Sequence, residues 1–481
     1  MTRPARTAAP PPRTAAPPPR TAAPPPQTAA PPPQTTAPPP QTTAPPPRTT
    51  APPPRTTALP LRAALERRWR RAAATALGLA CLALVAPGPA LGARAGTHGA
   101  PGTGTLWAGE ARAGTMRPPV PQGFVGVDVD GPILNPATGI DLQAQMRAMV
   151  ASGVQSIRAA FSWSQAQPYE SWSQVPPAVR SQFTDVDGRP FYFQVTDEIV
   201  AAAARARISV LPTVLYAPSW DAVPNPDGVS YPRAFGPYAA YLTALIDRYG
   251  PRGSFWRAHP GLPRMPIRAW QVWNEENLTY YWRQPFAPTY ARLLAAARAA
   301  IRRADPGARL VLGALTNAAW RALGELYRVR GARRLFDVVA VNGFTRLPAN
   351  VIVYLRLMRR AMDRFGDFAK PLLATEVSWP SAAGQVTGGF DFDTTEAGQA
   401  RNIAALLPAL GADRRALGLA GFYWYTWVGQ EPGPLPFDYA GLERFTAGRV
   451  VAKPALRAFA KAALALEGCR RKGAVATACI R

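Results

Sequence analysis

Eight apolar runs follow one another along residues 120–460, and a plausible helical segment comes after each of them. Alternating strands and helices of this number are typical of a parallel α/β fold, and eight repeats favour a closed (β/α)8 TIM barrel over an open sheet. A doubly wound nucleotide-binding sheet is disfavoured, because the glycines at 126–131 lack the G-x-G-x-x-G spacing. The predicted strands are 124–129, 154–160, 208–215, 267–273, 310–313, 336–342, 371–375 and 421–425, and the clearest helices are 201–207, 288–305 and 351–365.

The chain ahead of this region has a different composition. Residues 1–62 contain eight tandem copies of a Pro-rich seven-residue unit, which lacks the apolar bulk of a core and is predicted to be disordered or extended. In residues 63–95 a basic cluster precedes an apolar stretch (72–86) and an A-x-A-like site, which is the order of a secretory signal peptide. The alternative is an uncleaved N-terminal anchor, with membrane contact through residues 72–86. Residues 96–119 are predicted to be a linker.

The net charge and the cysteines indicate which partners and which cellular compartment to expect. The formal net charge of +26 comes mostly from arginines that are scattered along the chain, which does not indicate a nucleic-acid-binding stripe. Cys469 and Cys479 bracket a short polar tail, residues 461–481, and are expected to form a disulfide in an oxidising compartment. The protein is therefore predicted to be a secreted or extracellular monomer that does not bind nucleic acid.

Two glutamates end apolar runs in matching contexts. Glu275 follows predicted strand 4, Glu376 follows predicted strand 7, and tryptophans lie close to both in the sequence. Their separation is about three strand–helix units of roughly 31 residues, which places both carboxylates at one end of the barrel. Paired carboxylates are the usual equipment for cleaving a glycosidic bond. The competing interpretation is that each glutamate is a surface or salt-bridged acid.

Other kinds of active site are poorly supported by the composition. The two histidines are His98, outside the predicted barrel, and His259, in a Pro-rich loop away from any predicted strand end. A Ser-His-Asp triad and a zinc site therefore both lack their usual side chains. The sequence favours carboxylate catalysis without a metal or other cofactor.

The longest predicted connections follow strands 2 and 3. Loops at the carboxyl ends of barrel strands build the active site, so aromatic side chains in these connections are expected to line a substrate groove. Core packing is the competing interpretation for each of them. The aromatic residues concerned are Trp163, Tyr169, Trp172, Tyr216, Trp220 and Tyr231.

At Trp273-Asn274-Glu275 the sequence resembles the clan A (β/α)8 glycoside hydrolases, in particular cellulase- or β-xylosidase-like members of families 5 and 39. The resemblance covers about residues 120–460. It implies that Glu275 is the catalytic acid/base, that Asn274 contacts the sugar 2-hydroxyl, and that Glu376 is the nucleophile. The residues expected to bind the carbohydrate substrate are Asn274, Arg158, Trp163, Trp220, Tyr216, Asn342, Trp379 and Trp424.

The end of predicted strand 6 departs from the family pattern. Similar enzymes often carry a His-x-Tyr element there, whose tyrosine hydroxyl holds the nucleophile, whereas this chain has Asn342 and Phe344. Phe344 cannot donate a hydrogen bond. A slow or narrowly selective enzyme is therefore expected, unless Tyr423 or Tyr425 supplies the missing donor.

The predicted function is an exported retaining glycoside hydrolase that cleaves a β-linked oligo- or polysaccharide by double displacement. The carboxyl oxygens of Glu275 and Glu376 are expected about 5–5.5 Å apart. The pKa of Glu275 is expected to be raised while Glu376 is ionised. Two alternatives remain: a catalytically weakened barrel that binds cell-surface glycan, and a wall-associated structural protein tethered by its Pro-rich arm.

Overall fold

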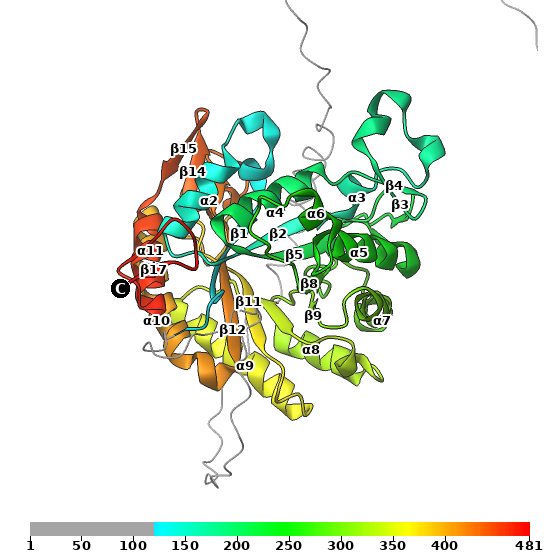
Figure 1. Ribbon diagram of the computed structural model, residues 1–481. Coiled ribbons are helices and arrows are strands. Elements are labelled where there is room, and N and C mark those ends of the chain that lie inside the picture. Colours follow the sequence, from blue (N-terminus) through cyan, green and yellow to red (C-terminus); the bar gives the residue numbers. More distant parts are fainter. Residues whose placement is uncertain (1–119) are drawn as a thin grey trace, which may run out of the picture. The chain divides into compact units, whose positions relative to one another are not determined.

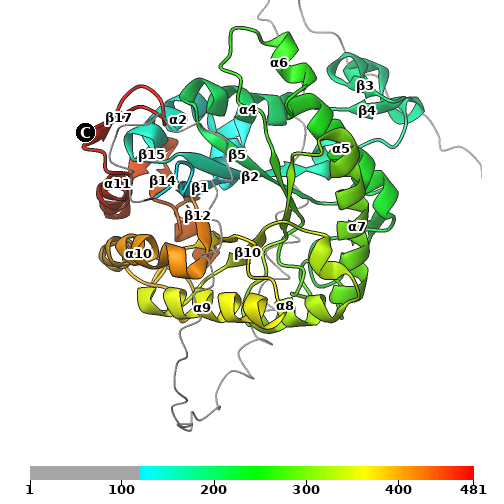
Figure 2. The same cartoon turned by 60° about the horizontal axis from the view of Figure 1, so that its bottom comes forward.

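The computed structural model describes residues 120–481, which form a parallel eight-stranded barrel with helices around it (Figure 1 and Figure 2). Each predicted strand overlaps one of the eight, so the predicted (β/α)8 fold is confirmed. The sheet order is β10-β11-β12-β1-β2-β5-β8-β9. The strands are β1 (Val125–Val129), β2 (Ser156–Ser162), β5 (Ser209–Leu215), β8 (Ala269–Val272), β9 (Arg309–Leu312), β10 (Val339–Asn342), β11 (Leu372–Val377) and β12 (Leu419–Trp424).

The helices begin and end at residues whose side chains or backbone favour those positions. Asp141 caps α2 by accepting a hydrogen bond from the Ala144 amide at 3.0 Å, and Thr395 caps α10 in the same way. Gly418 ends α10 with a φ of 61°, a conformation that glycine adopts without steric cost. The helices are α2 (Leu142–Ala151), α3 (Trp163–Ala166), α4 (Gln194–Ala206), α5 (Phe235–Tyr249), α6 (Ser254–Ala258), α7 (Ala287–Ala304), α8 (Ala319–Arg328), α9 (Pro348–Arg364), α10 (Glu396–Leu417) and α11 (Pro454–Glu467).

The apolar core has two layers, one inside the barrel and one between the barrel and its helices. Strands that are buried on both faces need apolar residues at nearly every position, which explains why the sequence shows continuous apolar runs instead of alternation. Small side chains predominate inside the barrel. The inner layer consists of Leu211, Ala269, Val311, Ala314, Val338, Ala340, Leu373, Ala420 and Tyr423.

The barrel closes between β9 and β10, a junction called here the seam. Two isolated bridges join these strands and the residues next to them, Val311 with Val338 and Leu315 with Val341. The Asn342 amide adds a hydrogen bond of 2.9 Å to the Leu315 carbonyl. By contrast, β2 and β5 pair continuously along seven residues. The seam is thus the less extensively paired of these two junctions.

The loops of the barrel contain additional short strands. Two hairpins lie in the long connections after β2 and β5, and a three-stranded sheet follows β12. These strands are β3 (Thr184–Val186) with β4 (Arg189–Phe191), β6 (Ala222–Val223) with β7 (Tyr231–Pro232), and β13 (Val428–Gln430), β14 (Glu443–Thr446) and β15 (Arg449–Ala452) together.

The C-terminal tail is closed by the predicted disulfide, Cys469–Cys479. Helix α11 continues past residue 460 to Glu467, and the strands β16 (Arg471–Lys472) and β17 (Cys479–Ile480) then pair with each other. Glu467 accepts a hydrogen bond of 2.7 Å from Gln155 and pairs with Lys472. Because Gln155 directly precedes β2, the tail packs at the amino edge of the barrel.

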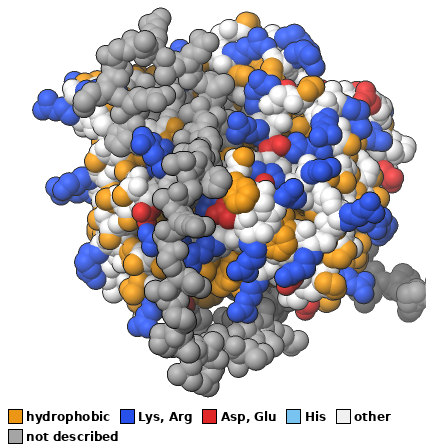
Figure 3. All heavy atoms as spheres, turned by 90° about the horizontal axis from the view of Figure 1, so that it is seen from below, with side chains coloured by type: hydrophobic (Ala, Val, Ile, Leu, Met, Phe, Trp, Pro, Cys, Tyr) orange, Lys and Arg blue, Asp and Glu red, His pale blue; other side chains and the backbone are white. Residues whose placement is uncertain are grey.

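Several predictions concern residues outside the described part of the chain. These are the Pro-rich repeats (1–62), the signal peptide or anchor (63–95) with its membrane-contacting stretch (72–86), and the linker (96–119). From residue 120 onward, no helix combines the length and the apolar character needed to cross a membrane. On the face drawn in Figure 3, Lys and Arg side chains are dispersed among polar and apolar ones and form no continuous stripe.

Candidate active site

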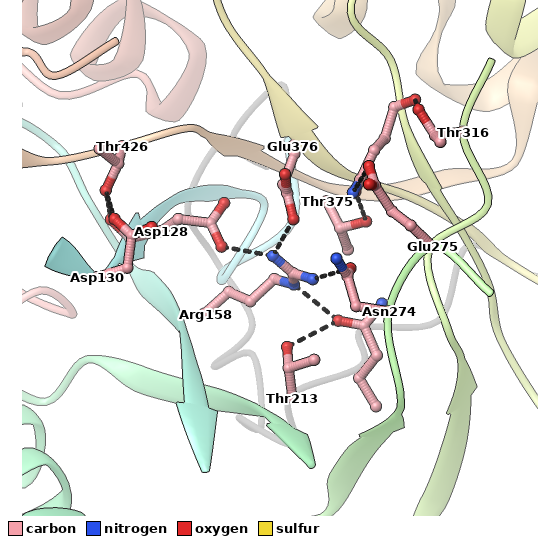
Figure 4. A network of polar contacts seen from close by, with 12 residues as sticks. Asp128, Asp130, Arg158, Thr213, Asn274, Glu275, Thr316, Thr375, Glu376 and Thr426 are labelled. Carbon is pink, nitrogen blue, oxygen red and sulfur yellow. Dashed lines mark hydrogen bonds and ion pairs between the residues drawn. The ribbon is translucent and has the colours of Figure 1, made fainter. Parts of the chain in front are cut away.

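Polar side chains gather where the barrel strands end, at the carboxyl edge of the sheet (Figure 4). They come from five different strands or the residues that follow them, so their proximity depends on the closed barrel. Within the described residues no cluster of three His, Cys, Asp or Glu side chains is arranged to hold a metal ion. The contributing residues are Asp128 from β1 and Asp130 just after it, Arg158 from β2, Asn274 and Glu275 after β8, Asn342 from β10, and Thr375 and Glu376 from β11.

Arg158 connects most of this network. Its Nη1 donates hydrogen bonds of 2.7 Å to both Asp128 Oδ1 and Glu376 Oε1. Its Nη2 donates to Asn274 Oδ1 at 2.8 Å, and its Nε donates to Gln271 Oε1 at 2.7 Å. With 5% of its surface exposed, the guanidinium is fixed by four side chains in a dry setting. It therefore orients Glu376 and Asn274 together.

Asn342 holds the other glutamate. Its Nδ2 donates to Glu275 Oε1 at 2.8 Å, and its Oδ1 accepts from Thr375 Oγ1 at 3.0 Å, which determines how the amide is turned. Asn342 also lies beside Glu376: burial raises the pKa of Glu376, and the nearby amide opposes that rise. The two glutamates are therefore brought together around one amide side chain.

The two glutamates have different electrostatic surroundings. Burial, followed by the charge of Glu376, raises the pKa of Glu275 to about 8. Burial also raises the pKa of Glu376, but the Arg158 guanidinium opposes it and favours the charged form. Arg158 opposes burial at Asp128 too, yet the pKa of Asp128 still lies well above its ordinary value. At neutral pH, Glu275 therefore keeps its proton, whereas the guanidinium favours the charged form of Glu376.

The backbone after β8 decides which of two adjacent glutamates enters the site. Trp273 and Glu275 have φ values of 70° and 46°, in the left-handed region that bulky residues rarely adopt. The Glu275 amide donates to the Ala314 carbonyl at 3.0 Å, which holds this turn. Glu275 then points into the network of Figure 4, whereas Glu276 is fully buried outside it. Strand alternation in the sequence could not make this distinction.

Glu276 lies behind the site, against Tyr290 and Gly313. A Cβ atom on Gly313 would lie 2.2 Å from Glu276 Oε2, so a larger residue there would have to displace the Glu276 carboxyl group. The Tyr290 hydroxyl donates to the Val272 carbonyl and accepts from the Gly313 amide, both at 2.7 Å. Burial raises the pKa of Glu276 to about 8, and Glu276 is therefore neutral at pH 7.

A second polar group lies beside Glu376. Asp130 accepts hydrogen bonds from Thr426, at 2.5 Å, and from Tyr425. Burial raises the pKa of Tyr216, and the nearby charges of Asp130 and Glu376 add to this rise. Sequence reasoning missed Asp128 and Asp130, although an aspartate within or just after an apolar strand is a signal for them.

Three expected substrate-binding tryptophans lie in the core instead. Trp163, Trp379 and Trp424 are fully buried, so they have no free surface on which a sugar could stack. Their indole N–H groups donate to Gln167, to the Thr345 carbonyl and to the Ala440 carbonyl, respectively. Tyr216 and Trp220, by contrast, keep part of their surface exposed.

The missing tyrosine donor is replaced by a different kind of group. Tyr423 lies inside the barrel, where its buried hydroxyl has no hydrogen-bond partner among the described residues, and the Tyr425 hydroxyl is directed to Asp130. The donor to Glu376 is Arg158, whose charged hydrogen bond is stronger than that of a neutral hydroxyl. The absence of a tyrosine at position 344 therefore does not leave the carboxylate without an orienting partner.

The fold is similar to those of known glycoside hydrolases. A family 39 glycoside hydrolase from the gut symbiont Bacteroides cellulosilyticus WH2 matches with a TM-score of 0.50 and 17% sequence identity, over 72% of this chain and 64% of that one. A family 39 enzyme from Xanthomonas axonopodis pv. citri matches with a TM-score of 0.47 and 19% identity, over 70% and 65%. A monomeric β-xylosidase from Caulobacter crescentus CB15 matches with a TM-score of 0.48 and 20% identity, over 70% and 67%.

The chain spans about two thirds of the length of these proteins. No protein-family model and no curated protein matches the sequence. Likeness at such low identity establishes the fold, and the expected resemblance to clan A (β/α)8 barrels is confirmed at that level.

Proposed function

We propose that this protein is a glycoside hydrolase that cleaves β-linked neutral saccharides with retention of configuration. The observation that carries the proposal is the contrast between the two glutamates. Glu376 Oε1 lies 2.7 Å from the Arg158 guanidinium, whereas Glu275 is held by a neutral amide and has a pKa raised to about 8. One carboxylate and one carboxylic acid are the two states that double displacement requires.

In the first step, the Glu376 carboxylate attacks the anomeric carbon and forms a glycosyl ester. The bond between that carbon and the glycosidic oxygen breaks, and Glu275 gives its proton to the departing oxygen. Arg158 keeps Glu376 directed at the sugar. Because Asn274 Oδ1 is already bonded to Arg158, its Nδ2 remains to donate to a sugar hydroxyl.

In the second step, water replaces the leaving group. Glu376 is now an ester without charge, so the repulsion that kept Glu275 protonated is gone and its pKa falls. Ionised Glu275 takes a proton from water, the water oxygen bonds to the anomeric carbon, and the ester bond breaks. Both glutamates return to their starting states. A separation of about 5–5.5 Å between their carboxyl oxygens is what this sequence of steps requires.

The charges of the site favour a neutral sugar. The network of Figure 4 contains four carboxyl groups, those of Asp128, Asp130, Glu275 and Glu376, around the one guanidinium of Arg158. A uronic acid would bring a further negative charge close to Glu376 and Asp130, which is unfavourable where water is largely excluded. The disulfide at the C-terminus supports export to an oxidising compartment.

The test is hydrolysis of a panel of 4-nitrophenyl β-glycosides of glucose, xylose, galactose, mannose and glucuronic acid. We expect turnover of at least one neutral glycoside, no turnover of the glucuronide, and a first product with the β configuration by proton NMR. Glycan binding without any turnover would instead support the non-hydrolytic barrel.

Two variants separate the roles of the glutamates. Glu376→Ala should abolish turnover of every substrate. Glu275→Ala should keep substantial activity on the 4-nitrophenyl glycoside, whose leaving group needs little protonation, and should lose it on a disaccharide. Glu325→Gln, an exposed position on α8, is the matched control and should change neither activity. Equal losses on both substrates in Glu275→Ala would refute its role as the acid.

A further inference from the structure

Five aromatic side chains form a contiguous group beside the catalytic network, called here the aromatic wall. They come from loops that follow three successive strands, β10, β11 and β12. Each ring is partly exposed. The wall consists of Phe344, Phe390, Phe392, Tyr425 and Phe437.

The rings of the wall contact one another directly. Phe390 stacks on Phe392 with centroids 4.7 Å apart, and Phe344 stacks on Phe392 at 5.6 Å. Phe437 lies 5.0 Å from both Phe344 and Phe390. Tyr425 meets Phe437 edge to face at 5.5 Å. The wall is thus one apolar surface built from separate loops.

The aromatic wall adjoins the catalytic network through Tyr425 and Phe344. The Tyr425 hydroxyl hydrogen bonds to Asp130 and lies close enough to Glu376 for that charge to affect it. Phe344 is two residues beyond Asn342, whose amide holds Glu275. The wall therefore adjoins the polar network, within reach of a group attached to a sugar bound there.

The chemistry of the wall suits an apolar group better than a second sugar. Phenylalanine rings offer no hydrogen-bond donor or acceptor, and the Tyr425 hydroxyl is already bonded to Asp130. A sugar covered by these rings would lose water from its hydroxyl groups without gaining partners, which is unfavourable. We propose that the aromatic wall is an aglycone site that selects alkyl or aryl β-glycosides. This inference rests on the proposed glycosidase function and specifies its substrate class.

A purely structural role for the rings is the competing explanation. The loops that carry them also have polar attachments of their own. Asp393 Oδ2 accepts from the Phe390 amide at 2.8 Å, and Asp438 Oδ2 accepts from the Leu435 amide at 2.9 Å. If the rings only held the loops, removing one would lower activity equally on all substrates. A change in the ratio between two substrates is therefore the decisive readout.

The experiment compares substrates that share a sugar and differ in whether the leaving alcohol is an alkyl chain or a second sugar. The pairs are octyl β-glucoside with cellobiose, and octyl β-xyloside with xylobiose. We expect the wild-type protein to have the higher kcat/KM on the octyl glycoside. Phe437→Ala should lower that value about tenfold, and should change the value for the disaccharide less than about twofold. Phe368→Ala is the matched control, because this ring is 62% exposed and precedes β11 at the opposite edge of the barrel.

The outcomes separate this inference from the proposed function. A wild-type preference for the disaccharide, or equal losses on both substrates in Phe437→Ala, would overturn the aglycone site while leaving the glycosidase intact. If none of the four compounds reacts, calorimetric binding of octyl β-glucoside decides: binding that Phe437→Ala weakens about tenfold supports the site, and no binding overturns it. The aryl glycoside panel decides the proposed function independently.

Discussion

Arg158 is the residue with the most connections in the site, and its replacement should affect catalysis and stability together. Arg158→Lys keeps a positive charge but cannot reach Asp128, Glu376, Asn274 and Gln271 at once. One lost charge-assisted hydrogen bond is worth about 1.5–3 kcal/mol, so we expect kcat to fall roughly ten- to a hundredfold.

Arg158→Met should be more severe, because it leaves buried carboxyl groups without their cation. Breaking a buried ion pair in this way costs about 3–5 kcal/mol. Thermal unfolding and turnover should be measured on both variants. Arg147→Met is the matched control, because this arginine is exposed on α2 and its side chain is 62% accessible. An unchanged melting temperature in Arg158→Met would contradict the central role of this residue.

The two glutamates predict a bell-shaped dependence of kcat/KM on pH. Glu275 must be protonated to act as the acid, so activity should fall as the pH rises through about 8. Glu376 must be ionised, so activity should also fall as the pH drops below its pKa, which burial raises above the ordinary value. Asn342 stabilises ionised Glu275, and its removal should raise the pKa of Glu275. We therefore expect the alkaline limb of Asn342→Ala to move to higher pH; an unmoved limb would assign it to another group.

The packing of β8, β9 and α7 contains a buried acid that should limit stability at neutral pH. In the unfolded chain Glu276 ionises above about 4.5, whereas in the folded protein it ionises above about 8. Its contribution is therefore most favourable below pH 4.5 and is lost progressively as the pH rises from 4.5 to 8. Glu276→Gln does not titrate, so its stability relative to wild type should increase by up to about 1.4 kcal/mol per pH unit in that window.

Denaturant unfolding at pH 5, 6, 7 and 8 checks the effect of Glu276→Gln. The exposed Glu325→Gln variant on α8 should show a constant difference from wild type over the same range. If the Glu276→Gln difference is also constant, Glu276 is not the buried neutral acid that its surroundings indicate.

The barrel strands were predictable because parallel strands buried on both faces leave continuous apolar runs in the sequence. Glu275 and Glu376 were found by the same signal, since each interrupts such a run with an acid. The choice between Glu275 and Glu276 depends on the φ values of Trp273 and Glu275, which are set by tertiary contacts. Residue type also does not reveal that Trp379 is in the core, because tryptophan serves equally in packing and in sugar stacking.

At the scale of the whole molecule, the disulfide and the catalytic network lie at opposite edges of the barrel. Replacing Cys469 and Cys479 together by serine should destabilise the protein by about 2–4 kcal/mol, mainly because the unfolded chain gains freedom. The value of kcat at 25 °C should not change, since the tail packs beside Gln155 and away from the strand ends. A large loss of kcat without loss of stability would contradict this separation.

The seam between β9 and β10 lies beside the turn that carries Glu275 and beside Asn342. The backbone amide of Glu275 donates a hydrogen bond to the Ala314 carbonyl. The backbone amide of Asn342 donates one to the carbonyl of Leu315, the residue after Ala314. Local opening of the seam would therefore separate the Glu275 carboxyl group, the proton donor, from the Asn342 side chain that holds it. Amide hydrogens at the seam, including that of Asn342, should exchange with solvent deuterium sooner than those between β2 and β5. Cooling, by keeping the seam closed for longer, should then increase the fraction of molecules ready to react even as it slows the chemical step itself.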